Sequence, residues 1–185
     1  MKTLATVACA ALLLLAVAAL AGLGWFHWAQ RVIASRMTAP ALKVERKAAP
    51  EMQFQMLDGR PMHLSEAKGK VVFLDLWGTW CVQCVAEMPT VQKLYEHYRD
   101  DGRVQMLIVS RMDSPERIRT YAARNHYTLP FYRMRDADIP TSMQLRQYPS
   151  TFVLDKQGRI AVEHTGAADW SAPSVTRLID TLESE

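Results

Sequence analysis

The sequence has few cysteines and no second C-x-x-C pair. Its three cysteines are Cys9, Cys81 and Cys84. A structural zinc site needs four ligands, usually from two such pairs or from paired histidines. The histidines of the C-terminal part are scattered singly, so we predict no metal site. The residue after Cys84 is Val85 rather than histidine, which excludes covalent haem attachment at this pair.

An excess of basic residues is also missing from most of the chain. The formal charge is +3, but residues 1–47 carry six of the 22 basic residues and one of the 19 acidic residues. Residues 48–185 therefore carry sixteen basic and eighteen acidic residues, a net charge of −2. A nucleic-acid-binding domain usually presents a basic face. We therefore predict no nucleic-acid partner.

Charged residues are absent between Thr3 and Gln30. The apolar run from Thr3 to Phe26 has 24 residues. As a helix this run would measure about 36 Å, enough to span a hydrocarbon core of about 30 Å. Trp25, Phe26 and Trp28 supply aromatic side chains of the kind found at membrane interfaces. We therefore expect residues 1–30 to form a transmembrane anchor.

The N-terminal segment leaves two questions open. Ala19-Leu20-Ala21 could serve as a signal-peptide cleavage site, so the alternative to an anchor is a cleaved export signal. Residues 31–50 form a basic linker, which by the positive-inside rule argues against export of the C-terminal domain. The chemistry of that domain has to decide on which side of the membrane it lies.

Residues 51–185 are expected to form one α/β domain. The segments around Asp58-Gly59 alternate in polarity and predict a hairpin. The apolar runs at 71–77 and 103–110 predict strands that are buried on both faces. Further elements are predicted as helices at about 81–98 and 115–125, a hairpin at 151–155 and 159–164, and a last helix opened by Ser171 and Pro173.

The paired cysteines lie where a predicted strand gives way to a helix. A disulfide between residues three apart closes a very small loop and stabilises little, so we interpret Cys81 and Cys84 as a redox pair. Cys81 would lie at the helix N-terminus, where free N–H groups and the helix dipole stabilise a thiolate. Cys84 would lie one turn further in as the resolving thiol. Trp77 and Trp80 would pack around the pair.

Two acidic residues flank the cysteines. Asp75 interrupts an apolar strand, where burial would raise its pKa. Glu87 follows Cys84 by three residues and would share its helix face. A carboxylate with a raised pKa at this place could accept the proton of Cys84. The alternative for Glu87 is an ordinary solvated helix residue. Pro89 is expected to kink the helix, because it lacks an N–H.

The segment "DLWGTWCVQCVAEMP" (75–89) resembles the active-site segment of membrane-anchored, thioredoxin-like thiol-disulfide oxidoreductases of the TlpA/ResA type, a redoxin group that includes cytochrome c maturation thioredoxins. The resemblance covers roughly residues 50–185. It implies a thioredoxin fold with an N-terminal β-hairpin extension and a central mixed sheet flanked by helices. It also implies that Glu87 is the functional acid of that group and that Asp75 matches the buried aspartate of thioredoxins proper.

The thioredoxin fold requires a cis-proline opposite the disulfide. The segment "QYPSTFVLD" places this residue at Pro149. From the residues alone, a trans proline at the entry of a strand is the alternative. Tyr148 departs from the small or β-branched residue that relatives usually have before this proline. We expect Trp80, Tyr148 and Pro149 to contact the substrate.

The resemblance implies thiol-disulfide exchange by Cys81 and Cys84 with no other cofactor. The expected substrates are exported proteins with disulfides or dithiols. We expect the protein to act as a reductant, for example during cytochrome c maturation, and to have antioxidant activity. A membrane thiol protein would donate the electrons. The domain would face the periplasm or the cell exterior from the cytoplasmic membrane. The alternative function is a copper-binding metallochaperone that uses the same thiols with His126 or His164.

Overall fold

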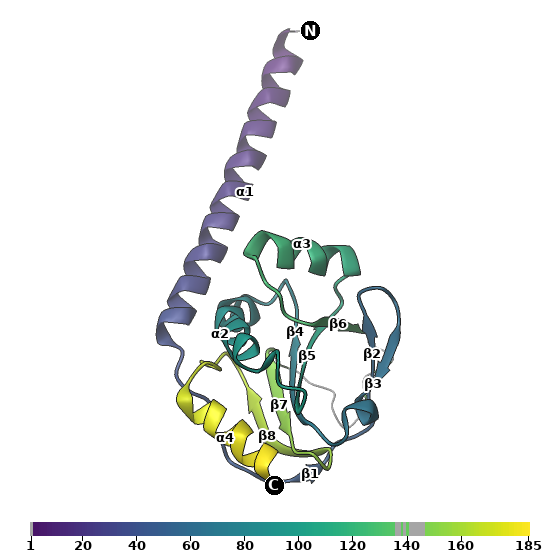
Figure 1. The fold of residues 1–185 in the computed structure, drawn as a ribbon. Helices are drawn as coiled ribbons and strands as arrows, with labels where there is room; N and C mark the ends of the chain where they lie inside the picture. The colour runs from purple at the N-terminus through teal and green to yellow at the C-terminus, as the bar shows by residue number, and fades with distance from the viewer. Residues whose placement is uncertain (1, 136–137, 139, 141–146) are drawn as a thin grey trace.

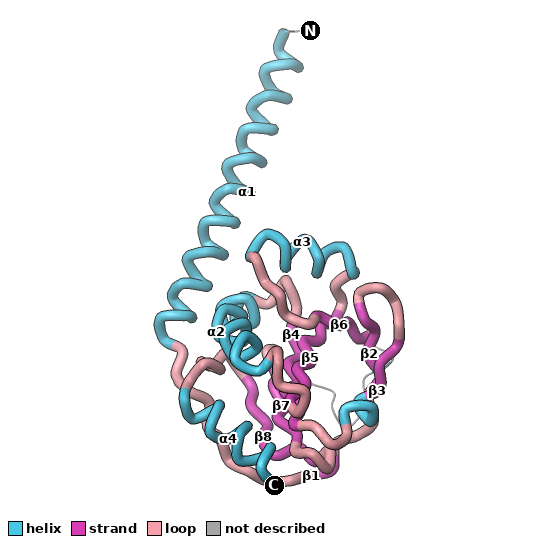
Figure 2. The backbone as a smooth tube through the Cα atoms, viewed as in Figure 1, coloured by secondary structure: helices cyan, strands magenta, loops and turns pink. Residues whose placement is uncertain are grey.

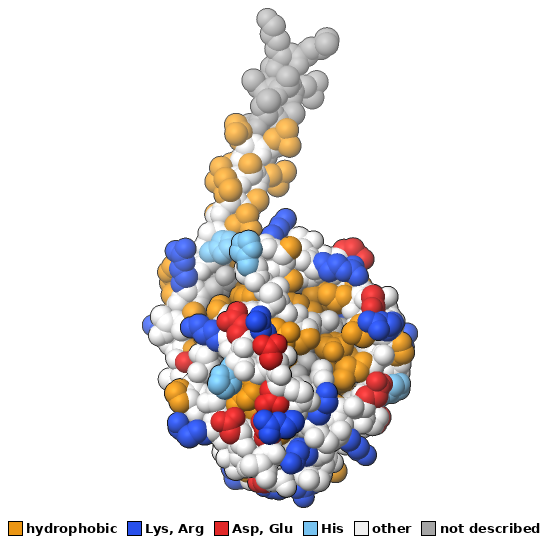
Figure 3. Space-filling model, viewed as in Figure 1, with side chains coloured by type: hydrophobic (Ala, Val, Ile, Leu, Met, Phe, Trp, Pro, Cys, Tyr) orange, Lys and Arg blue, Asp and Glu red, His pale blue; other side chains and the backbone are white. Residues whose placement is uncertain are grey.

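The computed structural model describes residues 2–135, 138, 140 and 147–185, with side chains from residue 12 onward. The chain begins with the long helix α1 (Lys2–Arg36), which projects from the domain with the N-terminus at its far end (Figure 1). Within it, Leu12–Arg36 is long and apolar enough to cross a membrane. Hydrophobic side chains cover this helix where it leaves the domain (Figure 3).

The last turns of α1 do not stand free of the domain. Phe26, Ala29, Gln30 and Ile33 are half-buried, whereas Trp25 and Trp28 are exposed. The half-buried residues recur at three- and four-residue spacing and so form one face of the helix. Helix α1 contacts α2 (Val82–Tyr98). The N-terminal helix is therefore packed against the helix that begins just after Cys81.

The domain is built on one mixed sheet of eight strands in the order β1-β8-β7-β4-β5-β6-β2-β3 (Figure 2). The central strand β4 pairs parallel with β5 and antiparallel with β7, and β5 pairs parallel with β6. The strands are β1 (Lys47–Ala48), β2 (Gln53–Met56), β3 (Pro61–His63), β4 (Val71–Trp77), β5 (Val104–Arg111), β6 (Phe131–Met134), β7 (Ser150–Leu154) and β8 (Arg159–Thr165).

Strand β4 is buried along its whole length and separates two apolar clusters. Side chains alternate between the faces of a strand, so Phe73 and Trp77 enter one cluster while Leu74 and Leu76 enter the other. Residues of α2, α3 (Pro115–Asn125) and α4 (Pro173–Ser184) contribute to the first cluster. The short 3₁₀ helix η1 (Leu64–Ala67) contributes to the second. The apolar run at 71–77, which only Asp75 interrupts, is thus explained by burial on both faces.

The predicted elements are largely confirmed. The N-terminal hairpin is β2–β3, and it adds to the sheet edge because β2 pairs with β6. Ser114 caps α3, accepting the amide N–H of Arg117 at 3.3 Å. The sequence did not reveal β1 and β6. Strand β1 has only two residues, and both are exposed, so it has no apolar pattern to read.

Candidate active site

The cysteine pair lies at the start of α2. Cys81 is the N-cap residue, and its sulfur accepts the amide N–H of Cys84 at 3.2 Å. The two cysteines form a disulfide, with 5.3 Å between their Cα atoms. Cys84 is completely buried, whereas 8% of Cys81 is exposed. This asymmetry fits the predicted roles, because the attacking thiol must reach a substrate and the resolving thiol need only reach Cys81.

Helix α2 runs on through Pro89 to Tyr98. Proline has no N–H to bond the carbonyl one turn earlier. The hydroxyl of Thr90 donates to the carbonyl of Glu87 at 2.8 Å and to that of Ala168 at 3.3 Å. The bond to Ala168 ties the helix behind Cys84 to the segment that leads to α4.

Aromatic and basic side chains border the disulfide. The peptide bond between Tyr148 and Pro149 is cis, as the family resemblance implies. The ring of Trp80 meets that of Tyr148 edge-on at 5.4 Å, and its N–H donates to the carbonyl of Arg111 at 3.5 Å. The guanidinium of Arg111 lies 5.4 Å from the centre of the Tyr148 ring and donates to the Tyr148 hydroxyl. Trp80 remains 45% exposed, so a substrate can touch it.

Gly78 provides the space that the Trp80 side chain occupies. A Cβ atom at Gly78 would overlap the Trp80 indole nitrogen and its ring carbons. A glycine is therefore needed here because another side chain comes too close to the backbone. Trp77, in contrast, is completely buried and packs at 5.0 Å from the ring of Tyr121 and 5.2 Å from that of Phe131.

The loop before Cys81 is held by Asp113, a residue that the sequence did not single out. Its buried carboxylate accepts the amide N–H of Thr79 at 2.8 Å, the hydroxyl of Thr79 at 2.7 Å and that of Ser110 at 2.6 Å. Arg117 pairs with this carboxylate at 3.2 Å and donates to Thr79 at 2.7 Å. The network fixes the strand-to-helix turn that presents the disulfide.

Asp75 lies on the face of β4 that α2 covers. It is completely buried, and its Oδ1 accepts the hydroxyl of Thr151 on the neighbouring strand at 3.2 Å. Within the described residues, its Oδ2 has no hydrogen-bond partner. Burial raises the pKa of Asp75 to about 7, and the single hydrogen bond from Thr151 opposes this only in part.

Glu87 is also completely buried, so it is not the solvated helix residue that the sequence left as an alternative. Its Oε2 accepts the amide N–H of Ala168 at 3.0 Å and the indole N–H of Trp170 at 2.9 Å. Its Oε1 has no partner among the described residues. Burial raises the pKa of Glu87 well above its usual range, and the nearby charge of Asp75 raises it further.

The two histidines considered as copper ligands lie apart in the fold. His126 is the exposed C-cap of α3, whereas His164 is half-buried on β8 and meets the ring of Trp170 edge-on at 5.6 Å. In the part of the chain that the structure describes, no group of three metal-binding side chains comes together.

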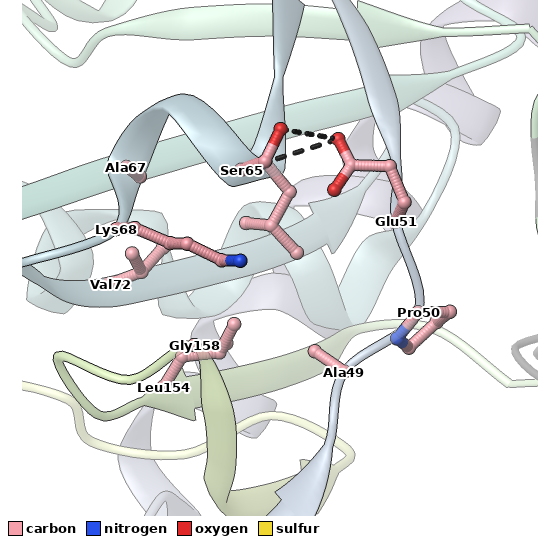
Figure 4. A pocket seen from close by; sticks show the side chains of 10 residues that line it. Ala49, Pro50, Glu51, Ser65, Ala67, Lys68, Val72, Leu154 and Gly158 are labelled. Atoms are coloured by element: carbon pink, nitrogen blue, oxygen red, sulfur yellow. Dashed lines mark hydrogen bonds between the residues drawn. The ribbon is translucent and has the colours of Figure 1, made fainter.

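A pocket beside η1 includes Glu51, Ser65 and Lys68 among its lining residues (Figure 4). None of the predicted site residues lines it.

Comparison with known proteins supports this picture. Residues 46–163 match the family model described as the AhpC/TSA family. The chain is 34% identical over 118 residues to the thiol-disulfide oxidoreductase ResA of Geobacillus thermodenitrificans strain NG80-2, covering 64% of this chain and 67% of that protein. It is 33% identical over 123 residues to the thioredoxin-like protein YneN of Bacillus subtilis strain 168, covering 66% and 72% respectively.

Among solved structures, the fold is similar to that of a putative protein disulfide isomerase from Bacteroides thetaiotaomicron, with a TM-score of 0.68. This similarity covers 80% of the present chain and 96% of the other. At 23% identity it shows the fold alone, which is the thioredoxin-like fold expected from the sequence.

Proposed function

The chain belongs to the AhpC/TSA family, and we propose that it reduces disulfides in exported proteins. It is a thiol-disulfide oxidoreductase, like the relatives that bear that name. The observation that carries the proposal is the disulfide at the start of α2, with the acids Glu87 and Asp75 buried behind it. A buried base beside the second cysteine suits a cycle in which that cysteine must repeatedly lose its proton.

In the proposed cycle the thiolate of Cys81 attacks a substrate disulfide and forms a mixed disulfide. The first substrate sulfur leaves as a thiolate and takes a proton from water. Glu87 then accepts the proton of Cys84, and the Cys84 sulfur attacks Cys81. The second substrate sulfur leaves, the Cys81–Cys84 disulfide re-forms, and two electrons have passed to the substrate. A dithiol protein of the membrane returns the pair to its reduced form.

The reducing direction follows from the charges around the pair. Strong oxidants of this kind stabilise their reduced form through a very acidic thiol. The residues between the two cysteines are the uncharged Val82 and Gln83. Two buried carboxyl groups lie behind Cys84, and the ionised form of either one disfavours a thiolate beside it. Both features favour the disulfide form of the protein, so its dithiol form is a reductant.

We infer the location of the domain from the apolar helix together with the disulfide chemistry. Helix α1 would hold the domain at the outer face of the cytoplasmic membrane, in the periplasm or at the cell exterior, where substrate disulfides form. Trp80, Tyr148 and Pro149 would contact the substrate beside Cys81. Proteins that are reduced during cytochrome c maturation are one proposed class of substrate.

The reduction potential of the pair tests the proposed direction. The full-length chain in detergent micelles is equilibrated with defined ratios of reduced and oxidised dithiothreitol, and the free thiols are counted by alkylation and mass measurement. We expect a potential below about −220 mV, near that of thioredoxin at about −270 mV. A potential near about −120 mV, the value of a strong oxidant, would overturn the reducing direction.

A further inference from the structure

One oxygen of the Glu87 carboxyl group is held by two donors from a distant part of the chain. The indole N–H of Trp170 and the amide N–H of Ala168 both bond Oε2, at 2.9 and 3.0 Å. The other oxygen, Oε1, is buried without a partner among the described residues. The carboxyl group is therefore bound asymmetrically, with one oxygen fixed and the other left open.

The indole of Trp170 is itself held from several sides. The side chain is completely buried, and its ring meets that of Phe73 edge-on at 5.1 Å and that of His164 at 5.6 Å. Its amide N–H donates to the hydroxyl of Thr90 at 3.1 Å. Thr90 lies on α2, one turn after Glu87, so the same two elements are joined twice. The indole N–H cannot turn away from Glu87 without disturbing these contacts.

We propose that Trp170 is a positioning residue for the resolving step, holding Oε2 of Glu87 so that Oε1 is the atom that receives the proton of Cys84. This proposal rests on the proposed function, in which Glu87 is the base. In that step the S–H bond of Cys84 breaks, its proton passes to Oε1, and its electron pair forms the new bond to the Cys81 sulfur. The substrate sulfur leaves with the electrons of the mixed disulfide.

The bond from Trp170 also adjusts how readily Glu87 holds its charge. Hydrogen bonds to a carboxylate favour its ionised form, so Trp170 and Ala168 lower a pKa that burial and Asp75 raise. Among the described residues, the titratable groups around Glu87 are Asp75 on β4 and, in the reduced protein, Cys84 on α2, with His164 of β8 behind the indole. Loss of the indole N–H should therefore raise the pKa of Glu87 further.

The test compares two tryptophan-to-phenylalanine variants of the full-length chain in detergent micelles. Trp170→Phe removes the N–H but keeps an aromatic ring. Trp77→Phe is the matched control, because Trp77 is also completely buried but its N–H has no partner in the described structure. The rate at which a preformed mixed disulfide on Cys81 resolves is measured against pH in single turnover. Glu87→Gln identifies the part of the profile that belongs to Glu87.

We expect Trp170→Phe to move the midpoint of the pH profile upward by about one unit and to slow resolution near pH 7 by up to about tenfold. Trp77→Phe should leave the midpoint in place. Equal midpoints in Trp170→Phe and the wild type, with a profile that still depends on Glu87, would overturn the proposal and leave Trp170 as a packing residue. A profile that Glu87→Gln does not change would instead overturn the base assignment in the proposed function.

A second measurement needs no folded variant at position 170. In the wild-type protein, the indole ¹⁵N–¹H resonance of Trp170 should shift with pH as Glu87 ionises, and this shift should vanish in Glu87→Gln. An indole resonance that stays fixed from about pH 5 to 10, while the resolution rate still changes, would overturn the proposal even if Trp170→Phe does not fold.

Discussion

Replacing Asp75 with asparagine should make the protein more stable at alkaline pH. Asp75 is completely buried, and burial raises its pKa to about 7 from an ordinary value of 3.8. Unfolding frees the carboxyl group to ionise, so above pH 7 its burial costs stability in full. The cost shrinks as the pH falls from 7 to 3.8 and vanishes below that. A pKa difference of about three units corresponds to about 4 kcal/mol.

Asparagine has nearly the shape of the protonated aspartic acid but cannot ionise. Asp75→Asn should therefore match the wild type near pH 4 and gain up to about 4 kcal/mol in free energy of unfolding near pH 8. Loss of the Asp75 charge also lowers the pKa of Glu87, which adds to the gain.

The assay is urea unfolding of the oxidised full-length chain in detergent micelles at several pH values, followed by tryptophan fluorescence. Asp100→Asn is the control, because the Asp100 side chain is 90% exposed and lies beside Arg99 at the surface. Parallel pH dependences for Asp75→Asn and the wild type would refute the reasoning, since they would show that Asp75 carries no buried-charge cost.

The remaining predictions concern the substrate surface and the anchor. Gly78→Ala should raise KM for protein substrates by roughly two- to tenfold, because the new Cβ displaces the Trp80 indole from its contact with Tyr148. Steady-state kinetics of substrate reduction measure this change. An unchanged KM would contradict the prediction. The full-length chain should sediment with membranes and resist alkaline extraction, because Leu12–Arg36 is long and apolar enough to cross a bilayer; a soluble mature chain beginning at Gly22 would establish a cleaved export signal instead.

Much of the fold was predictable because local patterns and burial agree. The apolar runs that became β4 and β5 are buried on both faces, and no amphipathic helix could have produced them. Helix α2, capped by Cys81, begins soon after the strand that ends at Trp77, as the sequence predicts. The cis peptide at Pro149 was expected from the family resemblance rather than from the residues themselves.

The surroundings of Glu87 could not be predicted from the sequence. Glu87 is followed by Met88 and Pro89, which say little about whether its helix face meets solvent. It is buried because α2 packs on the sheet and because a segment more than eighty residues later supplies two donors to one of its oxygens. The segment that contains Trp170 carries no pattern that signals such a role. Only the tertiary fold brings these groups together.

The same reason explains why Asp113 was missed. Asp113 lies between a buried strand and a capped helix, in a connecting segment where acidic side chains are usually exposed to solvent. In the fold it lies beneath Thr79, since the ends of the parallel strands β4 and β5 meet at one edge of the sheet. A register between strands has to be known before such a contact can be inferred.

The central claim is that Cys81 attacks substrate disulfides and Cys84 resolves the mixed disulfide. The most direct measurement is to express full-length Cys84→Ser and Cys81→Ser in the native membrane, quench with acid, alkylate and map the covalent adducts by mass spectrometry. We predict that Cys84→Ser accumulates exported proteins joined to Cys81 through disulfides, and that Cys81→Ser accumulates none. Adducts of equal amount on both variants, or normal multiple turnover by Cys84→Ser, would contradict the assignment.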